Sequence, residues 1–413
     1  MKTREVTYCP ECGGYSEPEA QTENNLCKTC KLPMEPRSLI LLRRMSAQDL
    51  SQSVLLRVNV VGESQQKALH TKFAAVCSSC QESAEIDLLS EELRDVLIAI
   101  LTKPSEVESI ARRLLPGANG NHRHRWSLQP TRATDYRVLK IRDLVGFEEA
   151  VEKTLVARDY RAYSLSGVSA EKKLLIDSEV LIDPSSHDLV LLVTHAAALG
   201  SSIDNVKLTD SETNELRSLQ SLDYEGLLTL ADNTIAPTIR GRATAKLVSL
   251  LTALSVNWFK VAGSEMPVPG CVRSLLCGDK RCGKGTIIRW WHDHAALGEH
   301  GIGEAASRAG LLYFVDTESN ILVWGLLPQA DLGLALIEAL HGVPREQLAE
   351  FREALVQQKI TVQKKVTGEA WVRVRILADA NPQKDLKEFV FPCQALTSIR
   401  CFLDPVDLTR WDL

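Results

Sequence analysis

The stretch EALVQQKITVQKKV at residues 353–366, followed by ILADANPQ at residues 376–383, decides the fold of this chain. The sequence from residue 359 onward predicts two strands around a turn, with Lys364 and Lys365 near the tip. From about residue 230, apolar strands alternate with helical patterns, which is typical of an α/β domain with a parallel sheet. We therefore expect an α/β domain that carries a basic hairpin.

Length and composition allow several domains and exclude some classes of protein. A chain of 413 residues is long enough for two or three domains. No apolar run approaches the roughly 20 residues that span a bilayer, and the polar start MKTREVTYCPEC lacks the pattern of a secretory signal. We expect an intracellular protein with no membrane partner, cytoplasmic or at the nucleoid in a prokaryote. The formal net charge of -5 gives no overall attraction to nucleic acid, so local basic loops must supply any DNA contact.

The pattern changes twice along the chain, which predicts three domains. Residues 1–46 are turn-rich and hold paired cysteines, as expected of a small module held together by a metal ion. Residues 47–205 contain alternating apolar segments, the pattern of a small β-barrel, interrupted by an insert at about residues 77–124 with two helical stretches. Residues 206–413 form the α/β part, beginning with a helix whose N-cap is Thr209 or Ser211.

The cysteines predict metal binding rather than disulfides. Six of the eleven cysteines fall in three CxxC pairs. Two of these pairs have the spacing that closes a tetrahedron of thiolates around a structural Zn(II) ion. These ligands are Cys9, Cys12, Cys27 and Cys30.

The third pair, Cys77 and Cys80, has no further CxxC nearby. The closest partners in the sequence are His122 and His124, and a site with two cysteines and two histidines is chemically sound for zinc. The alternative is that the two histidines are surface residues in a basic turn. The remaining cysteines are interpreted as small core residues.

A glycine-rich segment at residues 278–284 predicts a phosphate-binding loop. Its GxxxxGK pattern lies between a strand-like LLC and a helix-like TIIRWW. The expected nucleotide contacts are Gly278, Asp279, Lys280, Arg281, Cys282, Gly283, Lys284, Gly285 and Thr286. A working loop needs a hydroxyl for Mg²⁺ directly after the lysine, and Gly285 has none. Thr286 could replace it only if the helix began one position later.

Several segments in fixed order resemble the MCM family of replicative DNA helicases. Near the start of the α/β part, DNTIAPTIRGRATAK at residues 232–246 resembles the opening of the MCM ATPase, and the phosphate loop follows it. ALIEAL at residues 335–340 stands at the Walker B position, ILADANPQ at the first sensor, and LTRWDL at residues 408–413 resembles the arginine-finger motif. The earlier strands and the CxxC insert resemble the OB-fold barrel and zinc ribbon of that family.

The resemblance implies a fold and a set of roles. The fold is an N-terminal zinc ribbon, an OB-fold barrel with an inserted ribbon, and an AAA+ P-loop domain that stops after the finger motif, without the lid. Lys284 would hold ATP phosphates, Asn381 would orient water, and Arg410 would act on ATP bound by a neighbouring subunit. Glu338 stands at the Walker B Asp position, whereas Ala339 replaces the Glu that activates water.

Impaired hydrolysis and impaired Mg²⁺ binding follow from Gly285 and Ala339. An alternative acidic pair, Asp316 and Glu318, requires a long gap before the hairpin and is set aside.

The resemblance also implies DNA binding by a ring. Lys364 and Lys365 would contact the phosphate backbone of single- or double-stranded DNA, without reading bases. A second insert, at residues 296–312, would face the channel with His300 and Arg308. The expected assembly is a ring, such as a hexamer, of identical or different MCM-type subunits. Two alternatives stay open, namely a fully active ATP-dependent helicase and a zinc-ribbon and OB-fold module that binds single-stranded DNA.

Overall fold

The structure is a computed structural model, and it divides into two compact units. The first unit comprises Met1–Leu144, Thr154–Leu199 and Thr317–Ile321, and the second comprises Val145–Lys153, Gly200–Asp316 and Leu322–Leu413. Each unit is considered by itself. The described residues are 5–8, 15–16, 35–116, 118–119, 122–144, 159–165, 172–199, 209–219, 221–263, 267–295, 297–303, 308–317, 320–382, 391 and 403–412.

Strands dominate the first unit. They are β1 (Glu5–Tyr8), β2 (Tyr15–Ser16), β3 (Glu35–Ile40), β4 (Ser53–Ser64), β5 (Lys67–Cys77), β6 (Ser83–Asp87), β7 (Ala118–Asn119), β8 (His122–Arg123), β9 (Trp126–Asp143), β10 (Tyr160–Ser164), β11 (Lys173–Ile182) and β12 (Leu189–Ala198). The helices are α1 (Arg94–Thr102) and α2 (Val107–Leu114), as expected for the insert. Cys9, Cys12, Cys27 and Cys30 lie outside the described residues, so the first zinc ribbon stays a prediction.

Five strands of this unit close into a ring. The sheet runs β4-β11-β12-β10-β9, and β9 pairs back onto β4. All neighbours are antiparallel except β10 and β12, which are parallel. On β4 every second residue from Val54 to Val60 is buried in one cluster, with Ile176 of β11 and Leu191 of β12 among its partners. Successive side chains of a strand point to opposite faces, so these alternate residues share one face of β4, while Leu55 and Asn59 are buried on the other.

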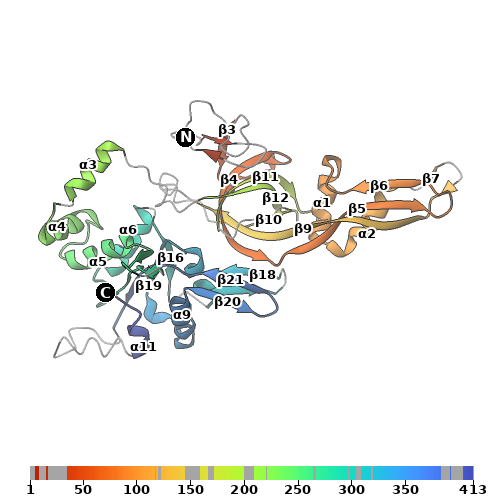
Figure 1. Ribbon diagram of the computed structural model, residues 1–413. Helices are drawn as coiled ribbons and strands as arrows, with labels where there is room; N and C mark the ends of the chain where they lie inside the picture. Colours follow the sequence, from red (N-terminus) through yellow and green to blue (C-terminus); the bar gives the residue numbers. More distant parts are fainter. Residues whose placement is uncertain are drawn as a thin grey trace. The chain divides into compact units, whose positions relative to one another are not determined.

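Beyond the ring, β5, β6 and β9 extend as a long arm, with β7 near its far tip (Figure 1). Strand β9 belongs to both the ring and the arm, since its end near Asp143 pairs with β4 and its start pairs with β5. The register that joins Cys77 to Trp126 carries the CxxC segment to the end of the β5–β9 pair. Helices α1 and α2 follow β6 in the chain, and α1 packs against β11 of the ring while α2 packs against β9.

The second unit alternates strands and helices. Its helices are α3 (Asp210–Leu219), α4 (Tyr224–Thr234), α5 (Ala243–Leu254), α6 (Lys284–Asp293), α7 (Arg308–Leu311), α8 (Leu326–Gln329), α9 (Arg345–Gln357) and α11 (Pro405–Leu408). Its strands are β13 (Trp258–Lys260), β14 (Pro267–Pro269), β15 (Arg273–Cys277), β16 (Glu299–Ile302), β17 (Tyr313–Asp316), β18 (Ile321–Trp324), β19 (Leu334–Glu338), β20 (Lys359–Gln363), β21 (Thr367–Trp371) and β22 (Arg375–Ala380). The predicted α/β pattern is confirmed. Thr209 caps α3, since its Oγ1 accepts the Glu212 N–H at 3.3 Å.

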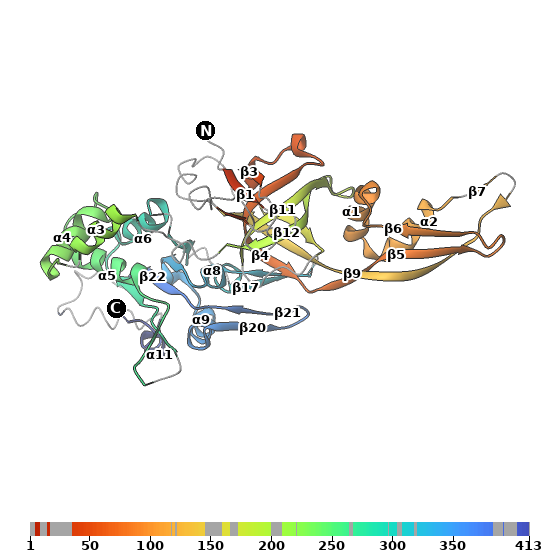
Figure 2. The ribbon, with the colours of Figure 1, turned by 45° about the horizontal axis from the view of Figure 1, so that its top comes forward.

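A parallel sheet organises this unit, in the order β15-β22-β19-β16. Both faces are covered, because a parallel sheet connected by helices is buried on both sides. On one face Leu336 and Leu377 pack with Ile287 and Trp291 of α6. On the other, residues such as Ile337 join a cluster that contains α9. Figure 2 shows α5 and α6 beside β22, α4 on the outer side of α5, and α9 next to the β20–β21 hairpin.

The predicted basic hairpin is present. Strands β20 and β21 pair antiparallel up to Gln363 and Thr367, which leaves Lys364 and Lys365 in the turn. Both lysines are exposed, while Val366 beside them is buried. Among the described residues of the chain, no helix is long and apolar enough to cross a membrane.

Candidate functional site

The loop between β15 and α6 lies at the carboxyl end of the parallel sheet, where open α/β sheets bind ligands. Two residues of the loop adopt left-handed backbone conformations, Arg281 with φ of 62° and Gly283 with φ of 91°. A side chain at Gly283 would also meet Ile239 at 2.9 Å, so glycine is required there on both counts. Helix α6 then begins at Lys284, and the free N–H groups of its first turn can face an anion.

Lys284 is the central residue of this loop. Its side chain is buried, and Nζ donates hydrogen bonds to the carbonyl oxygens of Gly278 at 2.8 Å and Asp279 at 2.7 Å. It also donates to Oδ1 of Asn381, just beyond β22, at 3.1 Å, and lies 3.5 Å from Sγ of Cys282. The structure thus brings together Lys284 and Asn381, two residues predicted from separate motifs. The lysine is held by neutral acceptors that an anionic ligand could replace.

Gly285 faces the end of β19. A Cβ atom built at Gly285 would lie 2.6 Å from Oε2 of Glu338, closer than real side chains approach one another. Thr286, by contrast, is exposed. Because α6 begins at Lys284, Gly285 and not Thr286 takes the position opposite the strand that carries Glu338.

Two basic side chains hold the Glu338 carboxylate. Its Oε1 accepts a hydrogen bond from Nε2 of His300 at 2.7 Å and lies 3.0 Å from Nε of Arg289. Sequence reasoning missed both contacts, since Arg289 was not singled out and His300 was assigned to a channel-facing insert. His300 instead lies on β16, within the parallel sheet, while the side chain of Arg308 lies outside the described residues.

A second carboxylate, Asp379 near the end of β22, also escaped the sequence analysis. Its Oδ1 accepts the backbone N–H of Ala339 at 2.5 Å. Burial raises the pKa of Asp379, and the charge of Glu338 raises it further. The hydrogen bond from Ala339 and the positive charge of Lys284 act in the opposite direction. Asp379 therefore shares the electrostatic environment of Lys284, although no ion pair joins these two residues.

The remaining candidates near the sheet lie as follows. The N–H of Asn381 donates to Nδ1 of His341 at 3.2 Å, and its side-chain amide lies 3.4 Å from Nε2 of the same ring. The two bonds orient Asn381 toward Lys284. Of the alternative acidic pair, Asp316 ends β17, which pairs with β18 and not with the parallel sheet, and Glu318 lies outside the described residues.

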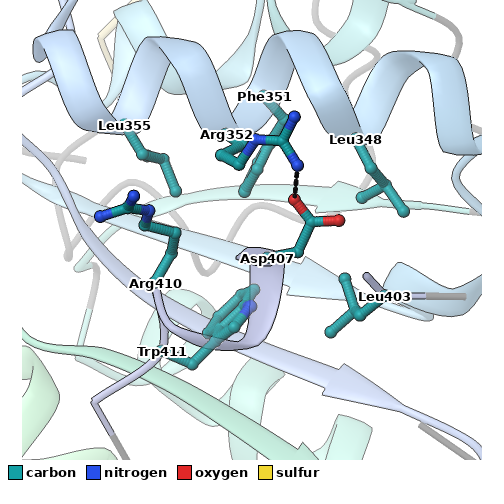
Figure 3. Close-up of a pocket in the computed structure, with 8 residues that line it drawn as sticks. All are labelled: Leu348, Phe351, Arg352, Leu355, Leu403, Asp407, Arg410 and Trp411. Atoms are coloured by element: carbon teal, nitrogen blue, oxygen red, sulfur yellow. Dashed lines mark hydrogen bonds and ion pairs between the residues drawn. The ribbon is translucent and has the colours of Figure 1, made fainter. Parts of the chain in front are cut away.

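Arg410 lies in a shallow pocket against α9 (Figure 3). Leu355 and Trp411 flank its side chain, and on the other side of the pocket Arg352 pairs with Asp407 at 2.8 Å. The Nε atom of Arg410 is buried without a hydrogen-bond partner among the described residues. Two bonds between Asp412 and the backbone of Arg273, at 2.8 and 2.9 Å, fasten this segment along β15. No contact described for Arg410 reaches Lys284.

The third CxxC pair forms a candidate metal centre in the first unit. Cys77, Cys80 and His124 bring their ligand atoms within 4.8 Å of one another. Sγ of Cys80 lies 3.5 Å from Nδ1 of His124, whose ring stacks on Trp126 with 5.0 Å between centroids. Of the predicted four ligands, three converge, and the side chain of His122 lies outside the described residues.

The chemistry of this cluster favours a cation. The pKa of the Cys80 thiol is raised, because desolvation and the neighbouring groups of Cys77 and Glu82 outweigh a lowering backbone hydrogen bond at Glu82. Two thiols at this distance cannot both ionise easily without a positive charge between them. Two sulfurs and an imidazole are ligands that Zn(II) accepts.

The order of the parallel strands, with a lysine-bearing loop at their carboxyl edge, defines a P-loop α/β domain. Comparison with known proteins makes this more specific. The model of the MCM P-loop domain family matches residues 214–395. Within the chain's C-terminal half, the predicted resemblance to the MCM family is therefore confirmed.

Individual proteins that match this chain are also MCM proteins. The chain is 27% identical over 198 residues to the DNA replication licensing factor mcm2 of Xenopus tropicalis, which covers 47% of this chain and 22% of that protein. It is 28% identical over 190 residues to the DNA replication licensing factor MCM3 of Entamoeba histolytica, with 43% and 31% covered. For mcm4 of Schizosaccharomyces pombe the identity is 27% over 209 residues, with 48% and 22% covered. The matches span between about a fifth and a third of these relatives' length.

Proposed function

We propose that this chain is a DNA-replication protein of the helicase family that binds ATP at Lys284 and DNA at the β20–β21 hairpin, with impaired hydrolysis. The observation that carries the proposal is the buried ammonium group of Lys284 at the carboxyl edge of the sheet, held by two loop carbonyls and Asn381. A triphosphate would replace these neutral acceptors with charged oxygens, and charge-assisted hydrogen bonds are about twice as strong as neutral ones. The first turn of α6 would add backbone donors.

Hydrolysis is impaired because the activating groups are missing. Ala339 offers no carboxylate, and loss of a general base costs about 10² to 10⁴ in rate. The residues present do not fit Mg²⁺ either. Gly285 has no hydroxyl, and the Glu338 carboxylate is already bound by Arg289 and His300. Arg410 stays proposed as a finger that acts on a nucleotide in a neighbouring MCM-type subunit of a ring.

A fully active ATP-dependent helicase is the second candidate, and Asp379 favours it. This carboxylate hydrogen-bonds the backbone of Ala339, so it lies beside the position of the missing acid. Burial raises its pKa, so its carboxylate accepts a proton more readily than an ordinary aspartate does. If Asp379 activates water, the chain hydrolyses ATP despite Ala339.

DNA contact is proposed for the hairpin turn. Lys364 and Lys365 are both exposed, and Nζ of Lys364 lies over the ring of Tyr313, 5.6 Å from its centroid. A lysine pair on a narrow turn can follow phosphates without reading bases. Single- and double-stranded DNA are both compatible with this contact.

The first unit is proposed to be an OB-fold that carries a zinc site. The closed ring of five strands, with β10 and β12 as its parallel pair, supports the OB assignment. The converging Cys77, Cys80 and His124 support zinc. A role as a separate single-stranded DNA-binding module would follow if this unit alone bound DNA as tightly as the whole chain.

Nucleotide binding is tested with Lys284→Ala. We expect the affinity for a fluorescent ATP analogue, measured by anisotropy, to fall at least about tenfold, which corresponds to about 1.4 kcal/mol. Lys260→Ala is the matched control, since Lys260 is an exposed lysine on β13. Equal affinity in the two variants would refute binding at Lys284.

Phosphate release decides between the two candidates. Negligible release by the unmodified chain supports the impaired ATPase. Release that is abolished by both Lys284→Ala and Asp379→Asn would establish ATP hydrolysis at this site and refute the impaired ATPase.

DNA binding is tested with the double variant Lys364→Ala, Lys365→Ala. Each phosphate contact adds about 0.9 to the slope of log affinity against log salt, so the slope should flatten by about two. Lys103→Ala serves as the control, because Lys103 is already paired with Glu106 at 3.8 Å. An unchanged slope in the double variant would exclude the hairpin as the DNA contact.

A further inference from the structure

We propose that Arg289 replaces the divalent metal ion of this nucleotide site, so that the chain binds ATP without Mg²⁺. The inference rests on the proposed function, since it requires a nucleotide at Lys284. It concerns the charge that stands beside the phosphates. Three sets of contacts carry it, namely Glu338 with Gly285, Glu338 with Arg289 and His300, and Arg289 with Gly285.

The first contact concerns space. Oε2 of Glu338 lies 2.6 Å from where the Cβ of residue 285 would be, and the carboxyl carbon lies 3.3 Å from it. The longer side chain of Glu338 therefore fills the volume that a serine or threonine at position 285 would need. A side chain at position 285 would require the Glu338 carboxylate to move away from Arg289 and His300. The missing hydroxyl has thus been replaced by a carboxylate.

The second contact concerns charge. The carboxylate of Glu338 already has two partners, Nε of Arg289 at 3.0 Å and Nε2 of His300 at 2.7 Å. Only 17% of the Glu338 side chain is exposed, so these contacts are partly shielded from water. Both partners contact Oε1, and Oε2 is the oxygen that lies beside Gly285. A metal ion at Oε2 would therefore stand next to the charge of Arg289 and would find no hydroxyl at Gly285. The carboxylate is thus arranged to hold a guanidinium group, not a metal.

The third contact places the guanidinium group. Arg289 lies one turn after Gly285 on α6, and its Nε reaches the Gly285 carbonyl at 3.4 Å. One of its terminal nitrogens lies 3.7 Å from the Cβ position at Gly285. The positive charge therefore stands at the start of α6, on the side that faces β19. Its side chain is 56% exposed, which leaves its terminal nitrogens accessible to a ligand.

A guanidinium group suits this role. It keeps its charge at every physiological pH and presents a planar fork of donors that matches phosphate oxygens. With Glu338 and His300 behind it, Arg289 would contact the outer phosphates while Lys284 contacts them from the loop. An ATP molecule that carries its own Mg²⁺ would bring a second cation against Arg289. Mg²⁺ should therefore leave binding unchanged or weaken it.

The test compares the affinity of the full chain for a fluorescent ATP analogue in excess EDTA and in excess Mg²⁺, by anisotropy. We expect the affinity in EDTA to equal or exceed that in Mg²⁺. Arg289→Ala should lose about tenfold in EDTA, a loss of about 1.4 kcal/mol. Arg289→Lys should recover part of it, because lysine keeps the charge and loses the fork. The control is Arg113→Ala, an exposed arginine on α2 of the first unit.

A converse variant restores the metal-binding groups. Gly285→Thr with Glu338→Asp supplies the hydroxyl and shortens the carboxylate, so Mg²⁺ should now tighten binding about tenfold. Circular dichroism checks that each variant is folded.

The outcomes separate this inference from the proposed function. Binding by the unmodified chain that is tenfold tighter with Mg²⁺, or an Arg289→Ala variant with full affinity in EDTA, would overturn the role of Arg289 and leave nucleotide binding intact. If the folded chain binds no nucleotide in either condition, both proposals fail.

Discussion

The Lys284 pocket and the Cys77–Cys80–His124 cluster differ in where the compensating charge comes from. In the pocket the chain supplies it, since Glu338 is matched by Arg289 and His300. In the cluster two thiols and an imidazole converge within 4.8 Å, and the charged neighbour at 3.6 Å from His124, Glu82, is itself an acid. The first arrangement is neutralised by its own side chains. The second is organised for an added cation.

This difference indicates two ways in which a site can balance its charge. At Gly285 the side chain of Glu338, from β19, occupies the space beside the glycine. A partly buried carboxylate needs a partner of opposite charge, which Arg289 supplies in the pocket, whereas the cluster has the acid Glu82 beside it. The predictions that follow test each half of the comparison.

Disrupting the proposed zinc site at Cys77, Cys80 and His124 should have the largest effect on local stability. Structural zinc in small sites contributes about 10–16 kcal/mol of apparent binding free energy, and a chain without it loses the local fold. Cys80→Ser should lower the zinc content by about one ion per chain and increase proteolysis at the tip of the β5–β9 arm.

Elemental analysis measures the zinc content. Ser79→Ala is the control, because Ser79 is the exposed residue beside Cys80 and is no metal ligand. A zinc content that stays the same in Cys80→Ser would show that this cluster holds no zinc, and the contrast between the two sites would disappear.

The substitution Gly285→Ala, which adds a methyl group, should change the free energy of unfolding by an intermediate amount. Replacing glycine by alanine inside a helix normally stabilises by about 0.5–1 kcal/mol, but here the added Cβ meets Oε2 of Glu338 at 2.6 Å. Overpacking of this kind costs about 1–3 kcal/mol, so Gly285→Ala should lower the free energy of unfolding. Glu338→Asp in the same chain should recover most of the loss.

Denaturant unfolding of the single and double variants measures this coupling. Thr286→Ala, on the exposed side of the same helix, should be nearly neutral. A stabilising Gly285→Ala would show that the pocket has spare room, as a metal-binding pocket would.

The smallest change in the free energy of unfolding is expected from the substitution Asp379→Asn. Folding raises its pKa, chiefly through burial, so the protonated form is favoured in the folded chain. Its contribution to the free energy of unfolding therefore falls as the pH rises from the ordinary value for aspartate through the raised value. Asp379→Asn keeps an acceptor for the Ala339 N–H and should be slightly more stable than the unmodified chain at neutral pH.

Thermal unfolding of Asp379→Asn and of the unmodified chain at several pH values measures the difference in stability. The stability difference should shrink toward acid pH, where Asp379 is protonated in both the folded and unfolded chain. If the Asn variant were less stable at neutral pH, the ionised carboxylate would be part of the charge balance of the pocket.

Local patterns predicted the parts of the fold whose signals lie within short segments. The helix cap at Thr209, the hairpin with Lys364 at its turn and the α/β alternation all follow from residues close in sequence. The phosphate loop could be recognised in the same way, because its glycines act through the backbone conformation of that segment alone. His300, by contrast, was misplaced because its role depends on which strand it joins.

The sequence by itself thus determined the P-loop α/β domain, the position of Lys284 and the absence of a hydroxyl at Gly285 and of an acid at Ala339. Only the tertiary structure decided what stands in their place. Glu338 fills the space at Gly285, Arg289 and His300 bind its carboxylate, and Asp379 reaches the backbone of Ala339. These are contacts between side chains from different strands and helices, and their distances depend on how the elements pack, which no local pattern encodes.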